Sequence, residues 1–192
     1  MEKYFVENKQ FDKNNFDKIH LQKGEYDNCK FNKCSFYNSD ISELVFIDCE
    51  FNDCNLSMVK TAGTTFNGVK FEYCKMLGVR FDNCNAFGLS INFDNCILDH
   101  SSFFKRKITK TIFSNSKITE ADFTECDLTN SVFDNCELTR SIFRNTILEN
   151  TDFRTVYNYS IDPEVNRIRK AKFSLFGIPG LLEKYDIEIE VK

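Results

Sequence analysis

The sequence has few of the features that carry catalysis, metal binding or membrane insertion. It contains only two histidines, His20 and His100, and its nine cysteines include no Cys-x-x-Cys pair. No apolar run approaches the roughly 18 residues of a membrane-spanning helix. The first ten residues also lack the apolar stretch of a secretory signal peptide. We therefore expect a cytoplasmic protein with no membrane contact, no metal and no other cofactor.

The sequence also lacks a strong excess of either positive or negative charge. The chain carries 25 basic and 29 acidic residues, a net charge of −4, and no segment is strongly polarised. Nucleic-acid binders show a basic stripe, so direct nucleic-acid binding is disfavoured. Glycine-rich phosphate loops are absent as well, since Gly177-Ile178-Pro179-Gly180 lacks the lysine and the spacing of one. The charge remains compatible with a partly acidic face that competes for a DNA-binding groove.

The chain does contain a large apolar residue at almost every fifth position, with the polar Thr61 and the small Ala86 as exceptions. The series runs from Phe11 to Phe153, with one slip of two residues between Ile91 and Phe93. A period of five matches neither the 3.6 of a helix nor the 2.0 of a strand. Only a chain that turns one corner per five residues sends every fifth side chain to a common axis. Four such sides close a coil of twenty residues, and the coils would stack like parallel strands.

The position two residues before each apolar centre holds a small side chain. In other repeats Ser, Thr or Ala takes this position. All nine cysteines occupy it: Cys29, Cys34, Cys49, Cys54, Cys74, Cys84, Cys96, Cys126 and Cys136. Free Cys packs as a small hydrophobe, and apolar walls suppress the thiolate. We therefore expect unpaired, inward cysteines and neither a disulfide framework nor a zinc site nor any catalytic residue. The twenty-residue register also predicts that Phe11, Phe31, Phe51 and Phe71 stack ring on ring.

The pentads Ala121-Asp122-Phe123-Thr124-Glu125 and Cys126-Asp127-Leu128-Thr129-Asn130 resemble the pentapeptide-repeat family. This resemblance covers residues 11–153 and implies an all-β solenoid, the right-handed quadrilateral β-helix. The domain organisation expected from it has three parts. Residues 1–10 form an N-terminal strand or cap, residues 11–153 form the rod with a phase break near 86–92, and residues 154–192 form a helical C-terminal cap and dimerisation segment.

Three places interrupt the repeat. A polar centre at Thr61, followed by Ala62-Gly63, predicts a widened turn or slight bulge. The slip at residues 86–92, which includes Gly88, predicts either a bulge or a junction between two rods. Arg106 falls in the small inward position, where an unpaired guanidinium is costly, so we expect the chain to swing outward there. A basic surface patch would result, made of Lys105, Arg106, Lys107 and Lys110.

After Phe153 the pattern changes to helical and cap signals. Asp162-Pro163-Glu164 predicts a short helix to about Lys170, Pro179 starts a second one, and residues 187–191 alternate like a strand. The open end of a repeat rod needs a cap. Because this segment offers more apolar surface than a cap requires, we expect a homodimer, with an intramolecular cap as the alternative. The expected dimer contacts are Ile178, Leu181, Leu182, Tyr185 and Ile187.

A narrower resemblance concerns function. A pentapeptide rod with a short N-terminal strand, a Gly-containing interruption at residues 85–91 and the terminal segment 181–187 is similar to the quinolone-resistance (Qnr) proteins and related gyrase-protecting immunity proteins. The resemblance implies a non-enzymatic protein that binds DNA gyrase or topoisomerase IV as a DNA-like rod and protects it from quinolones. The alternative is a general protein-interaction scaffold with an unrelated partner.

The expected partner contacts follow from this resemblance. Acidic side chains of the second run would substitute for DNA phosphates, and the basic segment would add further contacts. The acidic set is Asp94, Asp99, Glu120, Glu125, Asp127 and Glu137, and the basic set is Lys105, Arg106 and Lys107.

Overall fold

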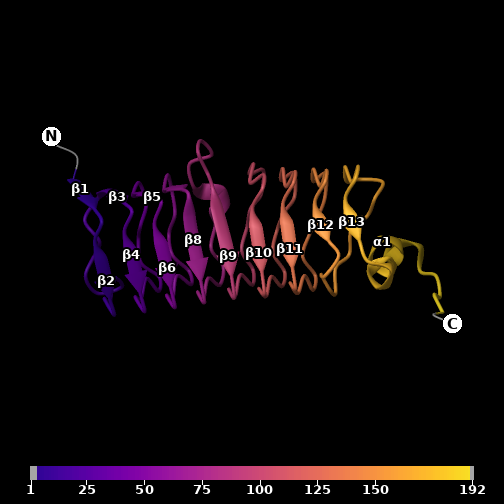
Figure 1. Cartoon of the computed structure of the whole chain (residues 1–192), viewed down its shortest axis with the longest axis horizontal. Coiled ribbons are helices and arrows are strands. Elements are labelled where there is room, and N and C mark those ends of the chain that lie inside the picture. Colours follow the sequence, from indigo (N-terminus) through magenta and orange to yellow (C-terminus); the bar gives the residue numbers. More distant parts are fainter. Residues whose placement is uncertain (1–3, 191–192) are drawn as a thin grey trace.

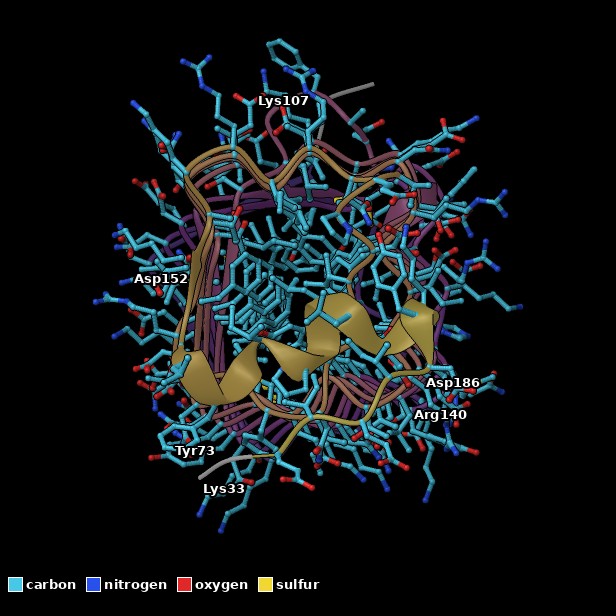
Figure 2. All side chains as sticks on the ribbon, turned by 90° about the vertical axis from the view of Figure 1, so that its right-hand side faces the viewer. Lys33, Tyr73, Lys107, Arg140, Asp152 and Asp186 are labelled. Atoms are coloured by element: carbon cyan, nitrogen blue, oxygen red, sulfur yellow. The ribbon has the colours of Figure 1, made fainter. Side chains whose placement is uncertain are left out.

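The computed structural model describes residues 4–190, which wind into a straight rod of stacked, four-sided coils (Figures 1 and 2). Successive coils pair in parallel, twenty residues apart in most places. Each side is one pentad, and its central side chain points to the axis. The all-β solenoid predicted from the period of five is confirmed.

We name the four sides faces A to D in chain order. Face A carries a four-stranded parallel sheet, and face B carries a nine-stranded one that runs the length of the rod. The strands of face A are β1 (Tyr4–Glu7), β3 (Gly24–Asp27), β5 (Val45–Ile47) and β7 (Thr65–Asn67). Those of face B are β2 (Gln10–Asp12), β4 (Lys30–Asn32), β6 (Glu50–Asn52), β8 (Val69–Glu72), β9 (Ile91–Asp94), β10 (Ile112–Ser114), β11 (Val132–Asp134), β12 (Asp152–Phe153) and β13 (Lys172–Phe173).

Faces C and D are held by single parallel bridges between coils. The face C bridges run from Asn15 to Tyr157, and those of face D run from Asp40 to Ile142. Face D also contains one short 3-10 helix, η1 (Phe81–Asn83). Beyond β7, face A continues as a row of bridges from Lys107 to Arg167.

The core is a set of side-chain columns along the axis. The rings of face B stack as predicted, with centroids 4.8 Å apart for Phe11 and Phe31 and 4.7 Å apart for Phe31 and Phe51. A second stack on face D includes Phe81 and Phe103, 4.7 Å apart. Parallel offset rings and the T-shaped contacts between neighbouring faces are both favourable aromatic geometries. All nine cysteines are buried in the small inward position and none is in a disulfide.

The corner after each centre needs a left-handed backbone. Most residues two positions after a centre have positive φ, for example Lys33 (53°), Asn95 (52°) and Asn130 (61°). Asn and Gly tolerate this conformation best, which explains why they recur in the polar positions.

The phase slip is a bulge, because face B continues through it. β8 and β9 pair with an offset of twenty-two residues, Val69 with Ile91. On face A, Asn85 N donates to Thr64 O and Ser90 N donates to Phe66 O, so residues 86–88 loop outward between these bonds, while Leu89 is buried in the core. The loop projects from the rod between β8 and β9 (Figure 1).

The irregularity predicted at Thr61 is present at the corner that follows this residue. Thr61 is buried in the centre position, and its Oγ1 donates a 2.6 Å hydrogen bond to Arg80 O. Gly63 N bonds Asn83 O, twenty residues later, whereas Glu43 N at the same corner of the preceding coil bonds Ala62 O, nineteen residues later. This longer step coincides with η1. The corner is therefore widened locally, while the Thr61 hydroxyl is satisfied within the core.

The outward swing predicted at Arg106 is wrong. The backbone stays in register, since Lys107 bridges Asp127 and Arg106 O accepts from Asp127 N. The side chain remains in the inward position, partly buried, and its Nη2 donates to Asp82 O. Its Nε is buried without a hydrogen-bond partner. The carbonyl bond offsets enough of the burial cost for the coil to continue unbroken.

The coil extends past the last predicted repeat, and the helix predicted for residues 162–170 is wrong. Arg167 bridges Ile147, and β13 extends the sheet of face B. Asn166 takes the inward position there and donates from Nδ2 to Phe143 O. Its amide thus replaces the cysteine or threonine of earlier coils, which favours another turn of coil over a helix.

Three short helical turns close the C-terminal end of the rod (Figure 2): η2 (Leu175–Gly177), α1 (Pro179–Leu182) and η3 (Glu183–Tyr185). They confirm the second predicted helix. The strand predicted for residues 187–191 is wrong over 187–190, which form no strand, and Val191 lies outside the described residues. No helix within residues 4–190 is long and apolar enough to cross a membrane.

Candidate protein-binding surfaces

Three of the buried cysteines are poor nucleophiles in this fold. Burial raises the pKa of Cys49, Cys84 and Cys136 to about 12. The thiolate that attacks a substrate is therefore almost unpopulated at neutral pH. Among residues 4–190, no group of three or more His, Cys, Asp or Glu side chains could hold a metal ion. The predicted partner and dimer contacts, except Arg106, lie on the outer faces or at the C-terminal end of the rod.

The six acidic candidates are distributed over faces A, B and C and the two corners of face D. Asp94 follows the strand centre of face B, Asp127 lies on face A, and Glu125 lies at the corner between faces D and A. The other three share face C and its corner with face D: Asp99, Glu120 and Glu137. The structure therefore brings together half of the predicted set.

Three of these six carboxylates have a basic neighbour that reduces their electrostatic field. Asp99 Oδ2 lies 3.3 Å from Lys117 Nζ, and Glu125 Oε2 lies 3.5 Å from Lys105 Nζ. Glu120 pairs with Arg140 and with His100, whose Nδ1 is 3.2 Å away. Such exposed pairs contribute about 0–1 kcal/mol each to stability. Their larger effect is electrostatic, because each removes one uncompensated negative charge from the rod.

The remaining three acids are engaged by neutral donors. Asn115 Nδ2 donates to Asp94 and holds the pKa of that carboxyl below its usual range. Asp127 accepts from the backbone and hydroxyl of Thr129, and Glu137 accepts from Thr139 Oγ1. No basic side chain among residues 4–190 forms an ion pair with these three carboxylates, so they are the stronger phosphate substitutes of the set.

The basic candidates do not form one patch. Lys105 lies over the Phe104 ring, 4.8 Å from its centroid, and pairs with Glu125. Lys107 projects from face A (Figure 2), whereas Arg106 turns into the rod. Of the four predicted residues, only the lysines are exposed, with Lys110 at the corner that follows Lys107, and Arg106 is not part of this surface.

The C-terminal candidates divide into two groups. Leu181 packs against the end of the core, and Leu182 is partly buried beside it. Ile178, Tyr185 and Ile187 are exposed. The first group therefore caps the rod, and the second is available to another chain.

Two family models match the chain. One, described as a pentapeptide repeat region, covers residues 89–157, and the other, described as pentapeptide repeats in eight copies, covers residues 49–85. Together they span more than half of the sequence, on either side of the bulge. The chain belongs to the pentapeptide-repeat family.

Among solved structures, 28 chains match this pentapeptide-repeat protein. A trypsin-treated variant of QnrB1, a plasmid-mediated fluoroquinolone resistance protein, has 17% identity and a TM-score of 0.65 over 97% of both chains. HetL, a pentapeptide repeat protein involved in heterocyst differentiation regulation from the cyanobacterium Nostoc sp. strain PCC 7120, has 10% identity and the same TM-score of 0.65, over 91% of this chain and 86% of its own. At these identities the likeness concerns the fold alone. No curated protein sequence matches the chain.

Sequence reasoning missed three exposed apolar residues of this pentapeptide rod. Phe87, at the tip of the bulge, is 95% exposed, and Leu175 and Phe176 in η2 are 83% and 84% exposed. A signal for Phe87 was present, since it is a phenylalanine off the five-residue grid beside Gly88. Leu175 and Phe176 carried no such signal, because their exposure depends on how the last coil ends.

Proposed function

We propose that this pentapeptide-repeat protein catalyses no reaction and acts as a rigid rod that binds a type II topoisomerase, DNA gyrase or topoisomerase IV, and protects it from quinolones. The observation that supports this proposal is the likeness to QnrB1 over 97% of both chains. The match includes both ends of the rod, where β1 and α1 lie. Fluoroquinolones act on type II topoisomerases, so a protein of this shape has a direct route to resistance.

In this proposal the topoisomerase contacts both charged sets. Three acids are engaged by neutral donors and by no basic side chain of residues 4–190, and they replace phosphates most effectively: Asp94, Asp127 and Glu137. Asp99, Glu120 and Glu125 contribute once their basic neighbours turn to the partner. Lys105 and Lys107 meet acidic groups of the enzyme, and Arg106 stiffens the coil between them.

A supercoiling assay with purified gyrase tests the proposal. The protein is titrated in with and without a quinolone. Rescue of supercoiling at protein concentrations well below those that inhibit the enzyme is the expected result. Inhibition without rescue would mean a competitor of DNA that offers no protection. No effect in either arm would contradict topoisomerase binding.

We also propose that two copies associate through their C-terminal ends. Ile178, Tyr185 and Ile187, together with Leu175 and Phe176, expose apolar side chains on one short segment. Patches of this kind mark association sites more often than scattered single residues do. Leu181 and Leu182 support the segment from below.

A double substitution tests the association. Leu175→Ser with Phe176→Ser should halve the mass measured by light scattering and leave the melting temperature of the rod unchanged, because neither side chain packs in the core. Ile112→Ser on face B is the matched control, since Ile112 is also exposed. A monomeric parent protein, or a variant that keeps the parent's mass, would contradict the dimer.

A second candidate function is an interaction scaffold with a partner unrelated to topoisomerases. HetL, which is involved in heterocyst differentiation regulation, has the same TM-score to this chain as the QnrB1 variant has. The salt bridges on Asp99, Glu120 and Glu125 also weaken the likeness to a DNA surface. Recovery of a different protein, and no topoisomerase subunit, in a pull-down would favour the scaffold.

A further inference from the structure

Face C carries an apolar groove that neither charged set includes. The groove has a volume of about 630 Å³, and its lining combines apolar side chains with polar ones and two basic ones: Tyr37, Met58, Leu77, Gly78, Asn55, Ser57, Lys75 and His100. It lies in the N-terminal half of the rod, on the coils before and at the bulge.

Gly78 makes room for this groove. Its φ is +67°, and a Cβ there would lie 2.9 Å from Met58 Sδ. The missing side chain allows Met58 to lie along the corner between faces C and D. Met58 is held at its backbone, where its N donates to Leu77 O. The flexible thioether can therefore adapt to a ligand while the floor of the groove stays rigid.

The apolar lining is exposed to solvent. Tyr37 is 51% and Met58 55% exposed, and Ile97 on the next coil and Tyr73 at the corner with face B are exposed as well. Figure 2 shows Tyr73 at the corner of the rod where faces B and C meet. Single exposed apolar residues are ordinary on a protein surface, but a group that lines a concave site is typical of binding.

Lys75 adds a positive charge with no partner. Unlike Lys30 and Lys117, it forms no ion pair with any side chain of residues 4–190. The reason is its register, since its bridge neighbours on face C are Asn55 and Ile97. His100, by contrast, already pairs with Glu120. The groove thus offers mainly apolar walls and the Lys75 ammonium, which forms no ion pair among residues 4–190.

We propose that this groove binds a segment of a partner protein that presents a large apolar side chain next to a carboxylate. The apolar side chain packs between Tyr37, Met58 and Leu77. The carboxylate accepts hydrogen bonds from the Lys75 ammonium, and partial removal of water strengthens this pair relative to an open surface. The proposal rests on protein binding in general and does not depend on the partner being a topoisomerase.

A matched pair of small probes separates the two parts of the site. The first probe, N-acetyl-leucyl-phenylalanine, carries two apolar side chains and a free C-terminal carboxylate. The second probe is the same dipeptide with a C-terminal amide, which has no negative charge. Both are titrated into the ¹⁵N-labelled full chain and followed by NMR. We expect shifts centred on the groove residues, and binding of the acid at least fivefold tighter than that of the amide.

Two charge variants make the assignment specific. Lys75→Gln keeps most of the side-chain stem and should reduce the difference between acid and amide to less than twofold. Lys70→Gln, an exposed lysine on face B without an ion pair among the described residues, should leave the difference unchanged. Equal affinities in the parent protein, or shifts confined to the C-terminal end, would overturn the proposal.

A third variant distinguishes a partner protein from a second copy. Leu77→Ser should weaken binding of both probes and leave the mass of the protein in solution unchanged. A drop in that mass would show that a second copy covers the groove, which would overturn the proposal. No topoisomerase is present in these experiments. A negative probe titration would therefore contradict only the groove proposal, and a negative supercoiling assay would contradict only topoisomerase binding.

Discussion

At the scale of single residues, the inward position next to each apolar centre selects for a donor as well as for small size. Cys54 Sγ donates to Phe31 O at 3.1 Å, and Thr151 Oγ1 donates to Leu128 O at 2.9 Å. In each case the acceptor is the carbonyl of a centre residue on the preceding coil. This bond explains why Cys, Ser and Thr alternate in one position, since each combines small volume with a hydrogen-bond donor.

Removing such a donor should destabilise the rod. In Thr151→Val the shape is kept, but Leu128 O loses one of two hydrogen bonds and keeps the one from Ser131 N, so the free energy of unfolding should fall by about 1 kcal/mol. Thr151→Ser keeps the donor and should cost less than Thr151→Val. Urea unfolding of the three proteins measures both changes. Equal stability of Thr151→Val and the parent would show that size alone governs the position.

The buried thiols predict a loss of stability at high pH. Burial raises the pKa of Cys49, Cys84 and Cys136 to about 12, compared with 9.0 for an unperturbed thiol. Because these groups bind protons more tightly in the folded state, their contribution is complete below pH 9 and is lost as the pH rises toward 12. The slope should reach about 1.4 kcal/mol per pH unit for each thiol.

Denaturant unfolding at several pH values between 7 and 11 measures this slope. Cys136→Ser should make it shallower by one thiol's share, because serine does not titrate in this range. A slope that is the same in the variant would contradict the assignment to the thiols.

At the scale of elements, the C-terminal turns are held by close contact with one tyrosine. Tyr159 Oη donates a 2.6 Å hydrogen bond to Gly177 O, and burial raises the pKa of Tyr159 to about 12. A Cβ on Gly180 would lie 2.3 Å from Tyr159 O and 2.8 Å from its ring. Glycine is therefore required for α1 to seat on the last coil.

Gly180→Ala should lift α1 from the end of the rod. We expect faster proteolysis within residues 174–190 and a loss of about 1–3 kcal/mol from the misfit. Gly88→Ala is the matched control, because nothing lies within 4 Å of its Cβ and only the positive φ of 74° opposes the change, at about 1 kcal/mol. Equal protease sensitivity of the two variants would contradict the role of Gly180.

The segment after α1 depends on charge. Lys184 Nζ lies 2.8 Å from Asp162 Oδ1 and 2.6 Å from Glu164 Oε2. The hydrogen bonds from Lys184 hold the pKa of both carboxyls below their ordinary values of 3.8 and 4.5. A depressed pKa stabilises the folded state above the ordinary value, and this contribution disappears as the pH falls through the depressed one.

We therefore expect the amides of residues 183–186 to lose protection from hydrogen exchange below about pH 4, after correction for the intrinsic rate. The amides of β10 and β11 should keep theirs over the same range. Lys184→Gln should show low protection in the segment at every pH. A parent protein with protection independent of pH would contradict this account.

At the scale of the whole molecule, the rod is a one-dimensional stack whose two ends differ. β1 and β2 are the terminal strands of their sheets, so within residues 4–190 nothing pairs with their outer edges. The other end is covered by Leu181 and the helical turns. In a stack of this kind, each coil is stabilised mainly by its two neighbours.

Opening should therefore begin at the N-terminal coil. Hydrogen exchange should be fastest in β1 and β2 and slowest in β8 to β11, and β13 should be protected more than β2 because of the cap. Native-state exchange followed by mass spectrometry measures this gradient. Gly180→Ala should increase exchange in β13 and leave β2 unchanged. Uniform exchange along the rod would indicate a single cooperative unit instead.

The sequence predicted the regular parts of the rod and missed the places where one residue departs from the pattern. The stacks of Phe11, Phe31 and Phe51 follow directly from spacing. Arg106 was expected to move the chain outward, because the carbonyl that accepts its hydrogen bond belongs to the preceding coil and cannot be seen in the sequence. The helix predicted from Asp162-Pro163-Glu164 failed because local capping signals were overridden by pairing with the coil before it.

The same division applies to the candidate surfaces. Which residues point outward was determined by the sequence alone, because a period of five assigns every position to the core, a corner or a face. Which outward charges remain free was decided by the tertiary structure. A twenty-residue coil places Lys105 on Glu125 and Arg140 on Glu120, and leaves Lys75 between Asn55 and Ile97. The field of a charge depends on its neighbours in space, and in this fold those neighbours lie one coil away along the chain.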